Sequence, residues 1–137
     1  MFNKILVPVD GSKESFKALS SALEISEMSG AEVTAFHTIP KTAEGGPRTR
    51  RLDADLNSEA KAVLKQASQY AKKKMIDINT KVARGSPAFE IIKFAKAGKY
   101  DHIVMSSTGT GSAKGDMLGS VSNYVLHKSK IPVYLIK

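Results

Sequence analysis

Residues 4–12 read KILVPVDGS, an almost unbroken apolar run followed by a polar turn. A run that does not alternate with polar residues is typical of a strand buried on both faces of a parallel sheet. Asp10 and Gly11 then turn the chain, and Ser12 is suited to cap a helix that Gly30 ends. This opening segment therefore predicts one β-α unit.

The same alternation continues along the chain. Further strands are expected at 31–39, 76–85, 101–106 and 131–136, and further helices at about 52–75, 87–98 and 118–129. In the third strand, alternation places Ile76, Ile78, Thr80 and Val82 on one face, while the glycine-, proline- and arginine-rich residues 41–51 predict a loop. The order predicts an α/β fold with a single open five-stranded parallel sheet, helices on both faces and one domain over residues 1–137.

Composition narrows the functional classes. The 137 residues include no cysteine, which excludes disulfides and thiolate metal sites. No apolar run approaches the roughly 20 residues of a membrane span, so we expect a cytoplasmic protein without a membrane partner. The formal net charge of +8 suits a polyanion, but no nucleic-acid motif accompanies it, and we do not expect a nucleic-acid partner.

The segment MSSTGTGSAKGDMLGSV, residues 105–121, carries the glycines Gly109, Gly111, Gly115 and Gly119. A glycine-rich turn before a helix can direct several backbone amides at one phosphate. The segment nevertheless fails the Walker A pattern, and Lys114 occupies the third glycine position of a dinucleotide fingerprint. By these templates alone, a phosphate site and a solvent loop both remain open.

The chain resembles the universal stress protein family over essentially its whole length. The resemblance rests on KILVPVDGS, on the second strand ending FHTIP, on GSPAFEIIKFA and on the closing GSVSNYVLHKSKIPVYLIK. Nucleotide-binding members carry Gly-x-x-Gly, nine further residues and then Gly-Ser or Gly-Thr. Here nine residues separate Gly109 from Gly119-Ser120, whereas the first glycine of the motif is replaced by Ser106.

The resemblance implies a Rossmann-like fold of the adenine nucleotide alpha hydrolase type and a binding site for ATP, or for AMP or ADP, with Mg²⁺ or Mn²⁺ as a candidate partner of the phosphates. It implies that Pro8, Val9 and Asp10 border the adenosine, and that the backbone of Thr38 reads the adenine edge. The segment implied to wrap the ribose and phosphates, with Gly111 inside the loop, comprises Met105, Ser106, Gly109, Gly119, Ser120 and Val121. Without the resemblance, Asp10 is interpreted as a turn former that bonds its own backbone.

Catalytic chemistry has little support in the sequence. His37, His102 and His127 fall on separate elements without metal-ligand spacing, so we assign them structural roles. No nucleophile elbow and no Walker-type lysine is present, and Asp116 is the one acid of the glycine loop and a candidate Mg²⁺ contact. We therefore assign no catalytic residues and expect at most slow ATP hydrolysis.

The expected function is a stress-response regulator that binds an adenine nucleotide. One alternative is a stress protein of the same fold that has lost the nucleotide and works through protein partners, which Ser106 favours. A second is a basic polyanion binder, and a third is a weak ATPase or AMP-binding enzyme. The apolar residues 131–136 are expected at a sheet edge, where they would form a homodimer, as the family commonly does.

Overall fold

The computed structural model describes residues 1–41, 50–108 and 118–137. Strands and helices alternate along the chain. The elements are β1 (Lys4–Pro8), α1 (Lys13–Ser29), β2 (Glu32–Ile39), α2 (Arg50–Lys72), β3 (Asn79–Arg84), α3 (Pro87–Ala97), β4 (His102–Ser106), α4 (Ser120–Lys128) and β5 (Val133–Ile136). This order confirms the predicted α/β class. Residues 42–49 of the predicted loop lie outside the described residues, and its last two residues belong to α2.

The five strands form one parallel sheet in the order β3-β2-β1-β4-β5. Ile5 of β1 pairs with Val33 of β2 on one side and with His102 of β4 on the other. The chain builds outward from β1 through β2 to β3, and then crosses back to add β4 and β5 on the other side. In open sheets of this kind, the crevice where the strand order reverses is the usual ligand site.

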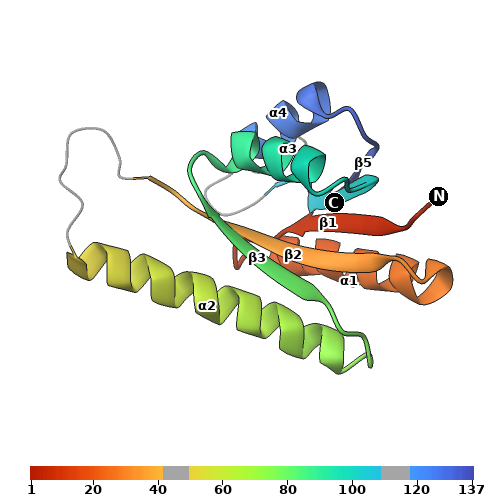
Figure 1. Ribbon diagram of the computed structural model, residues 1–137, viewed down its shortest axis with the longest axis horizontal. Coiled ribbons are helices and arrows are strands. Elements are labelled where there is room, and N and C mark those ends of the chain that lie inside the picture. Colours follow the sequence, from red (N-terminus) through yellow and green to blue (C-terminus); the bar gives the residue numbers. More distant parts are fainter. Residues whose placement is uncertain (42–49, 109–117) are drawn as a thin grey trace.

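Two helices cover each face of the sheet. Figure 1 shows α1 and α2 below the sheet and α3 and α4 above it. The α1–α2 layer buries Leu19 and Leu23 of α1 against β1 and β2, and the α3–α4 layer buries Ile91 and Val125 against Leu6 and its neighbours. None of the described helices is long and apolar enough to cross a membrane.

The caps of α1 form as the sequence predicts. The Ser12 side chain accepts a hydrogen bond from the Ser15 amide, and Gly30 ends the helix in the left-handed conformation at φ 77°. At α3, Ser86 occupies the N-cap position and Pro87 follows it, but the Ser86 side chain makes no capping hydrogen bond. The cap of α3 is therefore correct in position and wrong in its side-chain contact.

The third strand differs most from its prediction. It begins at Asn79, so Ile76 and Ile78 lie before it, where they pack partly buried against the α1–α2 core. Val82 lies in the strand but is 47% exposed. The reason is that β3 is an edge strand, which α2 and α3 cover only in part. Alternating apolar residues thus marked the region correctly, while the predicted start of the strand at residue 76 was wrong.

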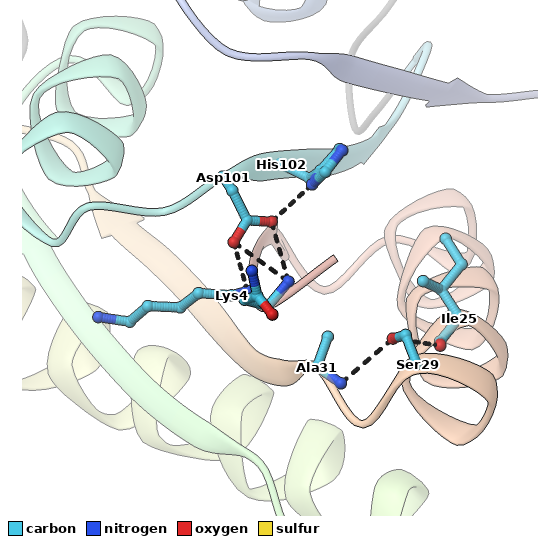
Figure 2. A network of polar contacts seen from close by, with 7 residues as sticks. Lys4, Ile25, Ser29, Ala31, Asp101 and His102 are labelled. Carbon is cyan, nitrogen blue, oxygen red and sulfur yellow. Dashed lines mark hydrogen bonds and ion pairs between the residues drawn. The ribbon is translucent and has the colours of Figure 1, made fainter. Parts of the chain in front are cut away.

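A polar network fastens β1 to β4 at the amino ends of the strands (Figure 2). The Asp101 carboxylate accepts hydrogen bonds from the backbone amides of Asn3 and Lys4, and it also contacts Nδ1 of His102 at 2.6 Å. Burial raises the pKa of Asp101, but these hydrogen bonds outweigh burial and lower it below its usual value. The network lies at the opposite end of the sheet from the pocket described next.

Candidate functional site

A pocket of about 460 Å³ opens at the carboxyl ends of β1, β2 and β4, beside the first turn of α4. The structure brings together around it all the described residues that the sequence assigned to the site. These are Pro8, Val9, Asp10, Thr38, Met105, Ser106, Gly119, Ser120 and Val121. Gly109 and Gly111 lie outside the described residues. The pocket therefore sits at the crevice where the strand order reverses, between β1 and β4.

The wall after β1 is a tightly bonded turn. Oδ1 of Asp10 accepts a hydrogen bond of 2.9 Å from the Ser12 amide, and the Asp10 amide donates to the Ser15 hydroxyl at 3.3 Å. Gly11 adopts φ 88°, a left-handed conformation that glycine accepts at low cost. The turn-forming role of Asp10 is thus present in the structure. Its predicted contact with an adenosine stays a prediction.

The wall after β4 contains Ser106, which replaces the first motif glycine. Among the described non-glycine residues only Met75 and Lys99 have positive φ, so Ser106 keeps an ordinary strand conformation at the end of β4. Its hydroxyl donates to the Thr108 carbonyl oxygen, and its own carbonyl oxygen accepts a 2.8 Å hydrogen bond from the Ser122 hydroxyl. A serine at this position therefore carries no backbone strain and ties the strand to the start of the loop and to α4.

The first turn of α4 closes the pocket. Gly119 is the N-cap, its amide donates to the Ser107 carbonyl oxygen at 2.9 Å, and no side chain caps the helix. The amides at the start of a helix lack intrahelical partners and, with the helix dipole, favour an anion. Ser120 and Ser122 add hydroxyl groups to the same wall. This end of the pocket can therefore receive a phosphate.

Several lining residues were not predicted from the sequence. Phe36, Ile91 and Leu118 supply apolar surface, and Ser15 and Pro87 complete the wall beside Thr108 and Ser122. His37 also lines the pocket, with only 8% of its surface exposed, and its Nδ1 lies 2.8 Å from the Val9 carbonyl oxygen. The signal for His37 was its position directly before Thr38, near the carboxyl end of β2. Its assignment as structural covers the hydrogen bond to Val9 but overlooks its place in the pocket wall.

Cations are scarce around the pocket. No lysine or arginine of the described ranges lines it. Within those same ranges, no group of three or more His, Asp or Glu side chains is placed to hold a metal ion. Asp116, the predicted Mg²⁺ contact, lies outside the described residues. The part of the site that the structure describes therefore offers amides and hydroxyls to a phosphate, and no preformed metal site.

A family model and two sequence relatives all indicate the same protein family. A family model described as "Universal stress protein family" matches residues 1–137. The universal stress protein MJ0531 of Methanocaldococcus jannaschii is 32% identical, over 100% of this chain and 83% of the relative. The universal stress protein YxiE of Bacillus subtilis is also 32% identical, over 100% of both chains.

Solved structures agree with this comparison. The universal stress protein UspA from Lactobacillus plantarum superposes with a TM-score of 0.88 at 29% identity, over 99% of this chain and 98% of the other. A universal stress protein in complex with cAMP gives 0.79 at 25% identity, over 99% and 97%. The universal stress protein from Archaeoglobus fulgidus in complex with dAMP gives 0.75 at 26% identity, over 100% and 98%.

Proposed function

The chain belongs to the universal stress protein family, and from this membership we propose that it binds an adenine nucleotide, ATP foremost, as a stress-response regulator. The observation that carries the proposal is the convergence of residues from β1, β2, β4 and α4 on one 460 Å³ pocket. Two relatives of similar fold are complexes with cAMP and dAMP, which supports an adenylate as the ligand class. The proposed binding domain spans residues 1–137.

The pocket offers different chemistry at its two ends. The adenosine would lie along Pro8–Asp10 and Thr38, where Phe36 and Ile91 provide apolar surface. The phosphates would lie at the α4 amino terminus, within reach of the amides of Ser120 and Val121. A divalent cation such as Mg²⁺ or Mn²⁺ would accompany the phosphates of ATP and offset their charge. The apolar and amide-rich ends thus match the two halves of a nucleotide.

We further propose that binding, and not turnover, is the function. Phosphoryl transfer requires a positioned nucleophile and neutralisation of the charge that develops on the phosphates. Of the described lining residues, Asp10 is the one carboxylate and His37 the one imidazole, while lysine and arginine are missing from that part of the lining. Both Asp10 and His37 are engaged with the backbone beside β1. These residues can hold a nucleotide more readily than they can cleave it.

The first experiment asks whether the purified protein carries a nucleotide. Protein prepared without added nucleotide is denatured, and the released material is separated by chromatography. Calorimetry with ATP and AMP, with and without Mg²⁺, then measures affinity for wild type, Gly119→Val and Ala97→Val. Gly119→Val places a side chain against the phosphate end and should abolish binding, whereas Ala97 is exposed at the end of α3 and its variant should bind normally.

The result also separates the alternative functions. Absence of co-purified nucleotide together with no calorimetric signal would refute the proposal and favour a stress protein that acts through protein partners. Binding of an oligonucleotide that weakens steeply with salt, without preference for ATP, would favour the polyanion alternative. Hydrolysis of ATP that is lost with Gly119→Val would instead indicate a weak ATPase.

We also propose a homodimer formed through residues 131–136, in a cytoplasmic protein. Supporting this, β5 is the edge strand beside β4, and Tyr134 on it is 42% exposed. An unpaired strand edge can pair with a second copy of the same chain about a two-fold axis. Sedimentation should show a dimer for wild type and a monomer for Tyr134→Lys, because this change would place a like charge on each of the two paired strands. A wild-type monomer at micromolar concentration would exclude this dimer.

A further inference from the structure

We propose that His37 is a specificity-determining residue of the pocket, whose Nε2 accepts a hydrogen bond from a donor group of the bound nucleoside. The inference rests on the proposed function, because it concerns the ligand of the same pocket. In this proposal a side chain selects among ligands, and it acts in addition to the backbone contact that is expected at Thr38. The proposed role of His37 is in binding and not in catalysis.

The contact of His37 with the backbone at the end of β1 determines the tautomer of its imidazole. Nδ1 lies 2.8 Å from the Val9 carbonyl oxygen, and a carbonyl oxygen can only accept a hydrogen bond. The hydrogen must therefore be on Nδ1. In the neutral imidazole, Nε2 then carries a lone pair and can act only as an acceptor. The backbone of β1 thus fixes the hydrogen-bonding character of the far side of the ring.

Nε2 of His37 can be reached from the pocket, although most of the side chain is buried. The side chain is 8% exposed, which leaves little of it in contact with bulk solvent. Nε2 nevertheless makes no hydrogen bond to another described residue, and it is not among the described polar atoms that are both unpaired and sealed from solvent. His37 is among the residues that line the main pocket and also among those that line a smaller one of about 210 Å³ between the end of β2 and α2. A ligand in the pocket can therefore reach this acceptor.

The residues around His37 in the smaller pocket favour a ligand group that donates a hydrogen bond. The residues that line the smaller pocket also include Asp10 and Glu59, whose carboxylates are acceptors when ionised. A group entering this corner gains by donating a hydrogen bond, and it loses by presenting another acceptor. The donors of an adenine nucleoside are its exocyclic amine and its ribose hydroxyls. Inosine has a carbonyl oxygen in place of the amine, so an acceptor would face an acceptor.

The experiment compares the affinities of several nucleotides for wild type and for two protein variants. Calorimetry measures ATP, inosine triphosphate, 2′-deoxyATP and 3′-deoxyATP against wild type, His37→Asn and His127→Asn. In His37→Asn, the shorter amide side chain can still donate to the Val9 carbonyl oxygen but lacks the distal acceptor. His127 is exposed near the end of α4, away from the pocket lining, and its variant is the matched control.

The expected result is that wild type and His127→Asn prefer ATP over one of the analogues by about threefold to tenfold, the worth of one neutral hydrogen bond. In His37→Asn this preference should disappear. If the preference that disappears is the one for ATP over inosine triphosphate, the exocyclic amine is the donor. If it is the one for ATP over a deoxynucleotide, a ribose hydroxyl is the donor. Equal affinity ratios in wild type and His37→Asn would overturn the inference while leaving nucleotide binding intact.

A second measurement covers the case in which His37→Asn does not fold. Nitrogen NMR of the wild-type imidazoles reports which ring nitrogen carries the proton and whether Nε2 gains a hydrogen bond. We expect the Nδ1–H tautomer, with an Nε2 shift that moves when ATP is added. A proton on Nε2, or an Nε2 shift indifferent to bound ATP, would overturn the inference. If wild type binds none of the four nucleotides, the proposed function fails, and this inference fails with it.

Discussion

Replacing Ser106 by glycine restores the motif glycine of nucleotide-binding relatives, and we expect it to lower stability without improving affinity. The variant loses the hydroxyl hydrogen bond to the Thr108 carbonyl oxygen, worth about 1 kcal/mol net. Glycine inside a strand costs a further ~0.5–1 kcal/mol in backbone entropy. The sum of about 1.5–2 kcal/mol corresponds to a decrease in Tm of roughly 5–7 °C for a domain of this size. Thermal unfolding followed by circular dichroism measures it.

The affinity for ATP should change by less than about threefold, because the φ of Ser106 is not positive and glycine relieves no strain there. Ser106→Ala separates the contributions, since it removes the hydroxyl and keeps the Cβ, and it should show only the hydrogen-bond part of the loss. Calorimetry of both variants decides the matter. A tenfold gain in affinity for Ser106→Gly, without a gain for Ser106→Ala, would show that the Cβ obstructs the ligand and would refute the reasoning.

Three further changes test the surroundings of the site. Gly11→Ala should destabilise by about 1–2 kcal/mol, because φ is 88° and the new Cβ would lie 3.1 Å from Val63; chemical denaturation measures it. Ser122→Ala removes a buried 2.8 Å hydrogen bond to the β4 backbone and should cost about 1 kcal/mol, again by denaturation. Burial raises the pKa of Asp101, but its hydrogen bonds, foremost that from His102, outweigh burial and leave the pKa lowered. Its stabilisation is therefore complete above the unfolded pKa of about 3.9 and is lost as the pH falls further, so the stability gap between wild type and Asp101→Asn should narrow below about pH 4. A gap that stays constant from about pH 7 to about pH 3 would contradict this.

The order of the elements could be predicted because each signal is local. The run at 5–9 is apolar without alternation, and β1 is indeed buried in the centre of the sheet. Ser12 and Gly30 mark the ends of α1 through interactions within one helical turn. The third strand shows the limit of such signals. Whether Val82 is covered depends on how far α2 and α3 extend over a sheet edge, and that distance is not encoded in the alternation of one strand.

The position of the site could also be predicted from the sequence, but not all of its residues. The ends of β1, β2 and β4 follow from the strand assignments, and topology brings such ends together. The resemblance added the particular residues of the glycine segment. His37 was missed as a pocket residue because its role depends on the 2.8 Å contact between Nδ1 and the Val9 carbonyl oxygen, a contact across two strands. No spacing rule for histidines contains that information.

The net charge of the chain turns out to say little about this pocket. The sequence carries a formal charge of +8, yet no lysine or arginine of the described residues lines the pocket. Lys72 and Lys73, for example, are exposed at the end of α2 and its following turn. The proposed phosphate recognition in the described part of the site would therefore rest on backbone amides and hydroxyls, whose dipoles are fixed by the fold. Such groups hold an anion by orientation rather than by net charge, so nucleotide binding here should depend only weakly on salt, whereas binding of a polyanion to the outer surface should depend on it steeply.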